Sequence, residues 1–363
     1  MSFGGATTVF HAFMATATAA PDNAFLCAPP APGRAYHPDG VEYTYAQARA
    51  EVLRFRDAYA AAGYGHGHRV ALLLENRPEM FFHYLALNAL GAGIVPVNPD
   101  YRHDELAYQM DHSEADLAVS VPERAATLDA VARERTKRLP VVSTAAWPMA
   151  LPKAGAAPRT GSPTHDTECA LLYTSGTTGR PKGCVLSNFY MLNGGAWYRD
   201  LGGRLAAQHG RDRILNPLPL FHMNCLGITG TRVILTASCL ILPERFSPRR
   251  WWPDVVATRP PPIHYLGVMP PLLLNQAPCP EEREHRVRFG LGAGVEPQLH
   301  EAFEKRFGFP LVEVWGMTET GRVFADRVDP RQITTRAFGR PHGRLEARVV
   351  GDGDAEVPHG TEG

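Results

Sequence analysis

The stretch Tyr173-Thr-Ser-Gly-Thr-Thr-Gly-Arg-Pro-Lys-Gly183 decides the fold, and it follows directly on the apolar run at 169–173. The apolar run predicts a strand, and the Gly- and Thr-rich residues after it predict a loop at the end of that strand. Gly176 and Gly179 let the backbone come close to a ligand. The loop also offers hydroxyl donors and one cation: Thr174, Ser175, Thr177, Thr178 and Lys182. Backbone N–H groups in such a loop suit an anion, most plausibly a polyphosphate.

The residues of this loop alone leave a second interpretation open. A Gly/Thr-rich segment between two regular elements is more often a plain surface loop than a binding site. It is not a Walker A loop, because Gly179 is followed by Arg180 and the pattern G-x-x-x-x-G-K-[ST] does not occur.

Upstream of the loop, strand-like and helix-like segments alternate. Thr44 can cap a helix that runs to about residue 62, with Gly63 as its stop. Residues 69–75 predict a buried strand, residues 78–91 a helix and residues 94–97 a second strand. Such a βαβ unit forms a parallel sheet with a right-handed crossover.

Downstream, residues 150–167 are rich in Pro, Gly, Ala, Ser and Thr and predict a linker. Further strands are expected at 213–215, 239–242, 263–268, 287–291 and 311–314, and helices at 248–258, 270–276 and 297–307. We therefore expect an α/β protein with at least two helix-covered sheets. We divide it into an N-terminal α/β subdomain at 1–166, a second α/β subdomain at 167–339 and the start of a β subdomain at 340–363.

Composition and charge exclude several classes of protein. A chain of 363 residues exceeds the size at which one hydrophobic core usually stops growing, so two packed units are expected. Lys plus Arg equals Asp plus Glu at 37 each, which gives no general attraction to nucleic acid. No uncharged apolar run approaches the length of a membrane span.

Two further patterns bear on location. Six scattered cysteines without a C-x-x-C pair predict a reducing, cytoplasmic environment. The apolar residues 10–20 predict a helix rather than a signal peptide, because no Lys or Arg precedes Arg34.

Three more segments follow the loop in order: Pro219-Leu-Phe-His-Met-Asn224, Gly292-Ala-Gly-Val-Glu-Pro297 and Trp315-Gly-Met-Thr-Glu-Thr320. With the loop, they resemble the signatures of the adenylate-forming superfamily: acyl-CoA synthetases, aryl-CoA ligases, firefly luciferase and nonribosomal peptide adenylation domains. The four matches cover most of residues 40–363, and the pattern is most similar to acyl-CoA ligases of the fatty-acyl or crotonobetaine/carnitine type. The resemblance implies the large N-terminal domain of that fold, with two helix-covered sheets and a small β-barrel-like subdomain.

The resemblance implies a nucleotide site as well. Its candidate residues are Thr174, Ser175, Gly176, Thr177, Thr178, Gly179, Gly292, Ala293, Gly294, Glu313, Trp315, Gly316 and Met317. Trp315 offers a flat face to adenine, although a Trp after a strand can equally be a buried core residue. Glu313 could accept from the adenine amino group, and the residues leave this assignment open.

The implied catalytic candidates are Thr318, Glu319, His222 and Lys182. Thr318 would donate to the α-phosphate, and Glu319 would hold Mg²⁺, which takes carboxylate oxygens together with substrate phosphates. A lone Glu is otherwise only a solvated charge. His222 would lie between the acyl site and the adenylate, although a lone His is more often structural. Lys182 supplies positive charge but is not the C-terminal lysine with which the family assists adenylation.

The activity implied is that of an AMP-forming acid–thiol ligase in two steps. A carboxylate attacks the α-phosphate of ATP to give acyl-AMP and pyrophosphate, and a thiol, usually that of CoA, then displaces AMP. The cofactors and partners expected are therefore ATP, Mg²⁺, CoA and a carboxylic acid, with a homodimer as a further expectation. Catalysis should be electrostatic and positional, because the first step brings anions together.

The acid itself is less constrained. Amino-acid-activating relatives carry an Asp directly after the Phe of the Pro219–Asn224 segment. Here His222 follows Phe221, which argues against an α-amino acid. The apolar runs at 221–226 and 264–274 could line an acyl pocket, and fatty acid metabolism is the expected setting. An aryl or other adenylating enzyme that loads a carrier-protein thiol is an alternative.

The resemblance stops at Gly360-Thr-Glu-Gly363. In the family a G-E-L segment, a Y-x-T-G-D segment, a hinge and a small C-terminal domain follow, and the C-terminal domain bears the lysine that assists adenylation. We therefore expect a truncated or proteolysed form without the small C-terminal domain, which binds nucleotide weakly and adenylates poorly. A non-catalytic fragment that binds acyl-adenylate is the alternative from another class.

Overall fold

The computed structural model describes residues 3–135, 137–148, 151–174, 179–342 and 345–363. The elements of the first half are α1 (Val9–Ala19), β1 (Ala24–Ala28), β2 (Val41–Thr44), α2 (Tyr45–Ala62), β3 (Arg69–Leu73), α3 (Glu79–Ala89), β4 (Gly93–Pro96), α4 (His103–His112), β5 (Leu117–Ser120), α5 (Pro122–Arg133), β6 (Val141–Ser143), β7 (Glu168–Thr174) and β8 (Lys182–Ser187).

The second half contains α6 (Asn188–Arg199), β9 (Arg213–Leu215), a π-helical turn (Asn224–Thr229), α7 (Gly230–Leu235), β10 (Cys239–Ile241), α8 (Trp251–Thr258), β11 (Pro262–Leu266), α9 (Met269–Leu274), α10 (Glu281–Glu284), β12 (Phe289–Ala293), α11 (Pro297–Phe307), β13 (Leu311–Met317), β14 (Gly321–Ala325) and β15 (Arg340–Pro341). No helix among the described residues is long and apolar enough to cross a membrane.

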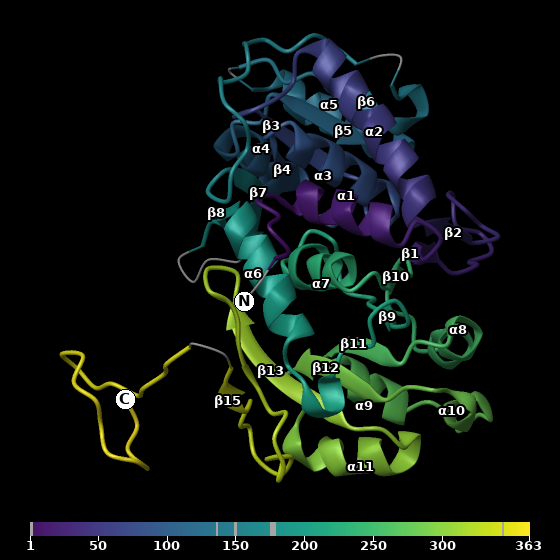
Figure 1. Cartoon of the computed structure of the whole chain (residues 1–363), viewed down its shortest axis with the longest axis vertical. Helices are drawn as coiled ribbons and strands as arrows, with labels where there is room; N and C mark the ends of the chain where they lie inside the picture. Colours follow the sequence, from purple (N-terminus) through teal and green to yellow (C-terminus); the bar gives the residue numbers. More distant parts are fainter. Residues whose placement is uncertain (1–2, 136, 149–150, 175–178, 343–344) are drawn as a thin grey trace.

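In the described part of the chain the strands form two sheets (Figure 1). The six-stranded sheet has the order β6-β5-β3-β4-β7-β8, and the nine-stranded sheet has the order β15-β14-β13-β12-β11-β9-β10-β1-β2. Most neighbouring strands are parallel, and β8, β14, β15 and β2 add antiparallel edges. The predicted α/β class with two sheets is confirmed.

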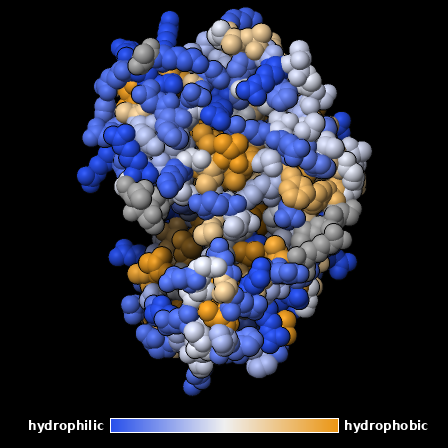
Figure 2. Space-filling view, turned by 90° about the vertical axis from the view of Figure 1, so that its left-hand side faces the viewer, coloured by the Kyte–Doolittle hydropathy of each residue, from blue (hydrophilic) through white to orange (hydrophobic). Residues whose placement is uncertain are grey.

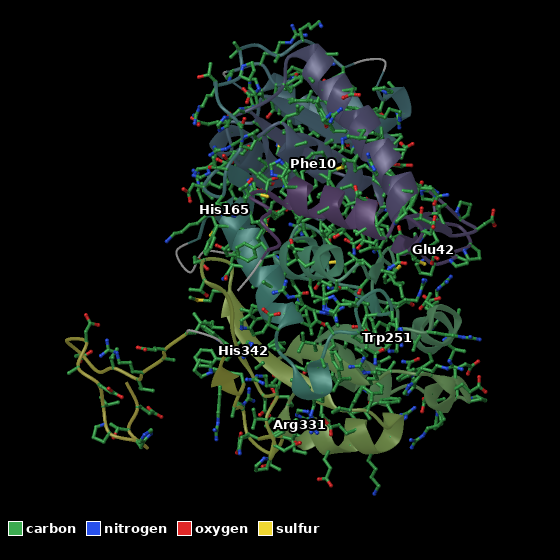
Figure 3. The ribbon with its side chains drawn as sticks, in the orientation of Figure 1. Phe10, Glu42, His165, Trp251, Arg331 and His342 are labelled. Carbon is green, nitrogen blue, oxygen red and sulfur yellow. The ribbon has the colours of Figure 1, made fainter. Side chains whose placement is uncertain are left out.

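Helices cover both sheets and also separate them. The largest apolar core contains residues of both sheets together with α1, α2, α3, α6 and α7. A second core lies between the six-stranded sheet and α4 and α5. A third packs the nine-stranded sheet against α8, α9 and α11, and includes Trp251 (Figure 3). The layers therefore run helix, sheet, helix, sheet, helix.

The local signals in the first half act as expected. The Gln47 N–H donates to Thr44 Oγ1 at 3.2 Å, and the Thr44 N–H donates to Gln47 Oε1 at 2.8 Å, which completes a capping box at the start of α2. Gly63 ends this helix with φ of 89°, a conformation that favours glycine. Strands β3 and β4 flank α3 and are parallel, so the predicted βαβ unit is confirmed.

Two expectations near the motifs were wrong. The strand predicted to end at residue 314 continues to Met317, because Trp315 and Gly316 pair with β14. The residues after Pro181 do not continue the loop, because β8 pairs antiparallel with β7. In both places a short antiparallel strand adds to a parallel sheet.

The segment predicted as a linker packs against the N-terminal layer. The Ala154 N–H donates to Ala62 O at 2.9 Å, and the Arg159 N–H donates to His66 O at 2.9 Å. The two sheets also do not divide at residue 166. Strands β7 and β8, which follow it, belong to the six-stranded sheet with β3, whereas β1 and β2, which precede it, belong to the nine-stranded sheet. The proposed subdomain boundaries and the β-barrel-like subdomain stay predictions.

A buried ion pair offers a test of this core. Arg232 and Asp212 are completely buried, and Arg232 Nη2 lies 2.6 Å from Asp212 Oδ2. We predict that Asp212→Asn, which keeps the shape and removes the charge, lowers the free energy of unfolding by about 3–5 kcal/mol. Urea denaturation measures this change.

The matched control is Asp129→Asn, which breaks the exposed pair of Asp129 with Arg133 on α5. It should cost less than about 1 kcal/mol. Equal losses of unfolding free energy in the two variants would contradict the larger contribution that we assign to the buried pair.

Candidate functional site

The matched segments lie at the carboxyl ends of strands. Strands β11, β12 and β13 are parallel neighbours, so their carboxyl ends share one edge of the sheet. Residues 292–294 and 315–320 lie at this edge, and the Gly/Thr-rich loop leaves the carboxyl end of β7. Ligands of open α/β sheets bind outside the carboxyl ends of strands. The candidate residues therefore lie where this fold class places its ligands.

A tight turn between β13 and β14 contains Thr318 and Glu319. Met317 pairs with Gly321, and the Met317 N–H donates to Thr320 Oγ1 at 3.4 Å. Thr318 is half-buried and Glu319 is exposed. The turn therefore presents one hydroxyl and one carboxylate next to each other at the edge of the sheet.

This turn lies beside the start of α6. A Cβ on Gly321 would meet the Tyr190 ring at 3.7 Å, so the hairpin and α6 are in contact there. Burial raises the pKa of Tyr190, and the nearby carboxylate of Glu319 contributes to the rise. The pKa of Cys184 on β8 is raised by the same two causes. Glu319 therefore lies near β8, the strand that follows the Gly/Thr-rich loop.

The turn after β12 is packed against the end of β11 with almost no space between the two backbones. Gly294 has φ of 88°, which favours glycine. A Cβ on Gly267 would lie 1.9 Å from Gly294 O, and one on Gly292 would lie 2.3 Å from Tyr265 O. Only glycine fits at positions 267 and 292 without a backbone shift. The close packing of the two backbones therefore depends on these two glycines.

Glu313 fastens this turn to its neighbours. Its Oε2 accepts from the Gly294 N–H at 2.7 Å, and its Oε1 accepts from the Tyr265 hydroxyl at 2.6 Å. The Val295 N–H adds a longer contact to Oε1 at 3.4 Å. Both carboxylate oxygens are occupied, which favours a positioning role for Glu313 over a direct contact with adenine.

Trp315 is not a buried core residue. Of its surface 36% is exposed, and its ring stacks on Phe338 with centroids 5.7 Å apart and an interplanar angle of 25°. Phe324 meets the same ring edge-on at 5.7 Å. Trp315 is therefore an ordered aromatic surface at the edge of the sheet, as the adenine assignment requires.

Part of the predicted phosphate loop falls outside the described residues, namely Ser175, Gly176, Thr177 and Thr178. The two ends of the loop are described: Thr174 pairs with Lys182 across β7 and β8. Lys182 is exposed. The hairpin thus holds the ends of the loop together and places a cation at its base.

The C-terminal side of the loop is anchored on α4. Gly179 has φ of 109°, and the Arg180 guanidinium lies 5.3 Å from the centre of the Tyr108 ring. The Tyr108 hydroxyl donates to Pro181 O at 3.0 Å. These contacts fix the direction in which the loop leaves the sheet.

His222 lies with this anchor in one cleft of about 860 Å³. Its lining includes Tyr101, Tyr108, Tyr173, Gly179, Arg180 and Phe221. His222 is exposed on the surface of this cleft, yet partial desolvation lowers its pKa below the ordinary value. The imidazole is therefore neutral at pH 7. The structure brings His222 next to the predicted phosphate loop, which sequence order alone does not show.

Apolar side chains are exposed around the strand edge. They are Val185, Phe189, Leu266, Val268, Leu272, Trp315 and Met317. Figure 2, which looks at the left-hand side of Figure 1, shows apolar surface gathered around a hollow at mid-height.

The side chains of the site offer few ligands for a divalent cation. Among the described residues no group of three or more His, Cys, Asp or Glu side chains could hold a metal. Mg²⁺ commonly uses only one or two carboxylates and takes its other ligands from substrate phosphates and water. A single exposed carboxylate at Glu319 fits that chemistry.

Sequence reasoning missed Arg322, which lies three residues after Glu319. Its side chain is 8% exposed, and its Nη1 has no hydrogen-bond partner among the described residues. A cation two residues after the end of a matched motif was the available signal. It was not recognised because the strand that buries it, β14, was not predicted.

The comparisons with known proteins agree with this geometry. The AMP-binding enzyme family matches residues 13–363, so the chain belongs to that family. It is 31% identical over 94% of its length to a sulfoacetate–CoA ligase of Cupriavidus necator, of which it covers 66%. It is 31% identical over 78% of its length to a medium/long-chain-fatty-acid–CoA ligase of Mycobacterium tuberculosis, of which it covers 48%.

A solved structure shows the same fold. The N-terminal domain of a Mycobacterium tuberculosis protein named FACL13 superposes with a TM-score of 0.80 at 22% identity, covering 97% of this chain and 86% of that one. The expected resemblance to an adenylate-forming N-terminal domain is confirmed. The chain spans between about half and two thirds of the two curated relatives.

The contact between the two glycine backbones gives a prediction. Gly267→Ala puts a methyl group 1.9 Å from Gly294 O, so the turn after β12 must move. We expect a loss of about 1–3 kcal/mol in stability and weaker binding of adenosine nucleotides. Urea denaturation and isothermal titration with AMP measure the two effects.

Gly155→Ala serves as the control, because a Cβ at Gly155 meets nothing within 4 Å. Nucleotide binding by Gly267→Ala that equals that of Gly155→Ala would show that this turn does not shape the site.

Proposed function

We propose that this chain is the nucleotide- and acid-binding part of an AMP-forming acid–thiol ligase. In the proposed reaction a carboxylic acid becomes acyl-AMP with release of pyrophosphate, and the thiol of CoA then takes the acyl group. The observation that carries the proposal is the arrangement of Trp315, Thr318 and Glu319 on one hairpin that lies against the strand following the phosphate loop. Membership of the AMP-binding enzyme family supports it.

The first step forms a bond between a carboxylate oxygen and the α-phosphorus and breaks the bond from that phosphorus to the pyrophosphate oxygen. Both reactants are anions, so the protein must offset their charge and hold them in line. We assign the α-phosphate contact to the Thr318 hydroxyl and positive charge near the phosphates to Lys182. Glu319 would hold Mg²⁺, which supplies charge neutralisation when bound.

In the second step the CoA sulfur attacks the acyl carbon and AMP leaves. The neutral His222 imidazole lies beside the loop anchor, and we assign it the role of a gate between the acid and the adenylate. Glu313 takes a positioning role, because it orders the turn at 292–294 through Gly294. Trp315 and that turn then form the adenine site.

The acid is not given by the family. The two relatives named above act, by their names, on sulfoacetate and on medium- or long-chain fatty acids, and each is 31% identical to this chain. The choice of acid must therefore be read from the residues of this chain. Transfer to a carrier-protein thiol is the second candidate for the acceptor. Cytoplasmic location, a homodimer and impaired activity of the 363-residue chain stay predictions.

A thermal-shift experiment tests the proposal on the chain itself. A non-hydrolysable acyl-adenylate mimic at about 100 times its Kd should stabilise the fold by about 2.7 kcal/mol. The matched control is the same acyl mimic built on guanosine, which should stabilise far less. Equal shifts with the two nucleosides, or none with either, would rule out an adenylate site.

The magnesium role has its own test. Titration with ATP should show that Mg²⁺ tightens the binding of ATP to the wild-type chain. In Glu319→Gln, the gain in ATP affinity that Mg²⁺ produces should be about tenfold smaller. Binding of AMP, which lacks the β- and γ-phosphates, should change little. Glu301→Gln on the exposed face of α11 is the control. A full Mg²⁺ effect in Glu319→Gln would exclude that carboxylate as the ligand.

A further inference from the structure

Arg322 is a buried cation that has no counter-ion among the described residues. It is the second residue of β14 and pairs with Gly316, and 8% of its surface is exposed. Among the described residues, its Nη1 has no hydrogen-bond partner, and no carboxylate is among the groups that act on its charge. Burial lowers its pKa, to about 10, so the guanidinium is still charged at neutral pH.

The groups around Arg322 do not supply a negative charge. They are Tyr190 and Tyr198 from α6 and Tyr265 from β11. Burial raises the pKa of each of these phenols, to about 12 for Tyr198. His264, also on β11, has its pKa lowered well below the ordinary value by burial and then by Arg322. All four neighbours are therefore neutral at pH 7.

A second buried arginine shows what the fold does when a cation is only structural. Arg232 is completely buried and is matched by Asp212, with Nη2 and Oδ2 2.6 Å apart. An unmatched buried charge is strongly unfavourable, because the desolvation of the ion is not offset. Unlike Arg232, Arg322 has no carboxylate partner among the described residues.

Unpaired polar atoms lie near the same charge. Tyr190 Oη and His264 Nδ1 are buried without hydrogen-bond partners among the described residues. His264 Nε2 lies 3.1 Å from the Tyr198 hydroxyl, so of its two ring nitrogens only Nδ1 lacks a hydrogen-bond partner among the described residues. A ligand oxygen that accepts from Arg322 could also accept from the Tyr190 hydroxyl, and these donors together suit an anion with two or three oxygens.

Arg322 is also close to the proposed reaction centre. Tyr190 lies within electrostatic range of both Glu319 and Arg322, so the two charged residues share one tyrosine as a neighbour. Directly after Arg322, the Val323 carbonyl accepts from the His342 N–H at 3.3 Å. The His342 ring lies 6.5 Å from that of Trp197 on α6. The cation thus lies where this hairpin meets α6 and β11.

We propose that Arg322 binds a second anionic group of the acid substrate, a carboxylate or a sulfonate at the end opposite the carboxylate that is activated. The substrate class is then a short dianionic acid. The inference rests on the proposed function and adds the acid to it. The reacting carboxylate is a poorer partner for Arg322, because it loses its charge when it becomes an acyl-adenylate. A long alkyl tail would bury Arg322 further without pairing it.

The test compares the binding of acyl-adenylate mimics of equal length by isothermal titration. The probes are non-hydrolysable adenylates of succinate, 3-sulfopropanoate and butanoate. We expect the wild-type chain to bind one of the two dianionic probes about 10- to 100-fold more tightly than the butanoate probe. The carboxylate and sulfonate probes then distinguish the two anions.

Arg322→Met keeps the length and removes the charge. It should bind the three probes with affinities within about threefold of one another, and its butanoate affinity should equal or exceed that of the wild type, because no buried charge is left unpaired. Arg327→Met is the matched control: Arg327 lies five residues further on and donates to Leu201 O. It should keep the wild-type preference.

The outcomes separate this inference from the function on which it rests. If the wild type binds all three adenylates equally, or prefers butanoate, the role of Arg322 is overturned and the adenylate site stands. If none of the probes binds, the proposed function and the inference both fail. The comparison of wild-type affinities decides the question even where Arg322→Met does not fold.

Discussion

The carboxylate of Glu313 holds three strand ends in one arrangement. It projects from β13, accepts from the Tyr265 hydroxyl on β11 and accepts from the Gly294 N–H in the turn after β12. The glycines at 267, 292 and 294 let these backbones meet, since a Cβ at 267 or 292 would collide with a neighbouring carbonyl. The edge of the sheet that presents Trp315, Thr318 and Glu319 depends on this one tie.

Two parts of the site have different origins. The proposed adenylate half consists of backbone turns and one hairpin, whose shape follows from glycines and from the contacts of Glu313. The proposed acid half consists of side chains from α6, β11 and β14, which come from distant parts of the sequence. The two halves therefore depend on different residues of the chain.

The sequence predicts elements well where the signal is local. The α2 helix is defined by Thr44, Gln47 and Gly63, and the βαβ unit of β3, α3 and β4 by apolar runs and punctuating residues. The antiparallel strands β8 and β14 were missed, because each owes its stability to a partner strand rather than to its own composition. With β14 unknown, the burial of Arg322 could not be foreseen.

The candidate residues were found through motifs, and the structure adds their neighbourhood. It brings His222 to the loop anchor at Arg180 and gives Glu313 a structural partner in Gly294. Residues 175–178 lie outside the described part, so the central residues of the phosphate loop rest on the motif alone.

The most direct measurement is a crystal structure of this chain with a non-hydrolysable acyl-adenylate mimic. Our account predicts the adenine ring against Trp315 and the turn at 292–294, and the phosphate-mimicking group within hydrogen-bond distance of Thr318. A mimic bound elsewhere, or an adenine ring that contacts neither Trp315 nor that turn, would contradict the assignment of this strand edge as the adenylate site.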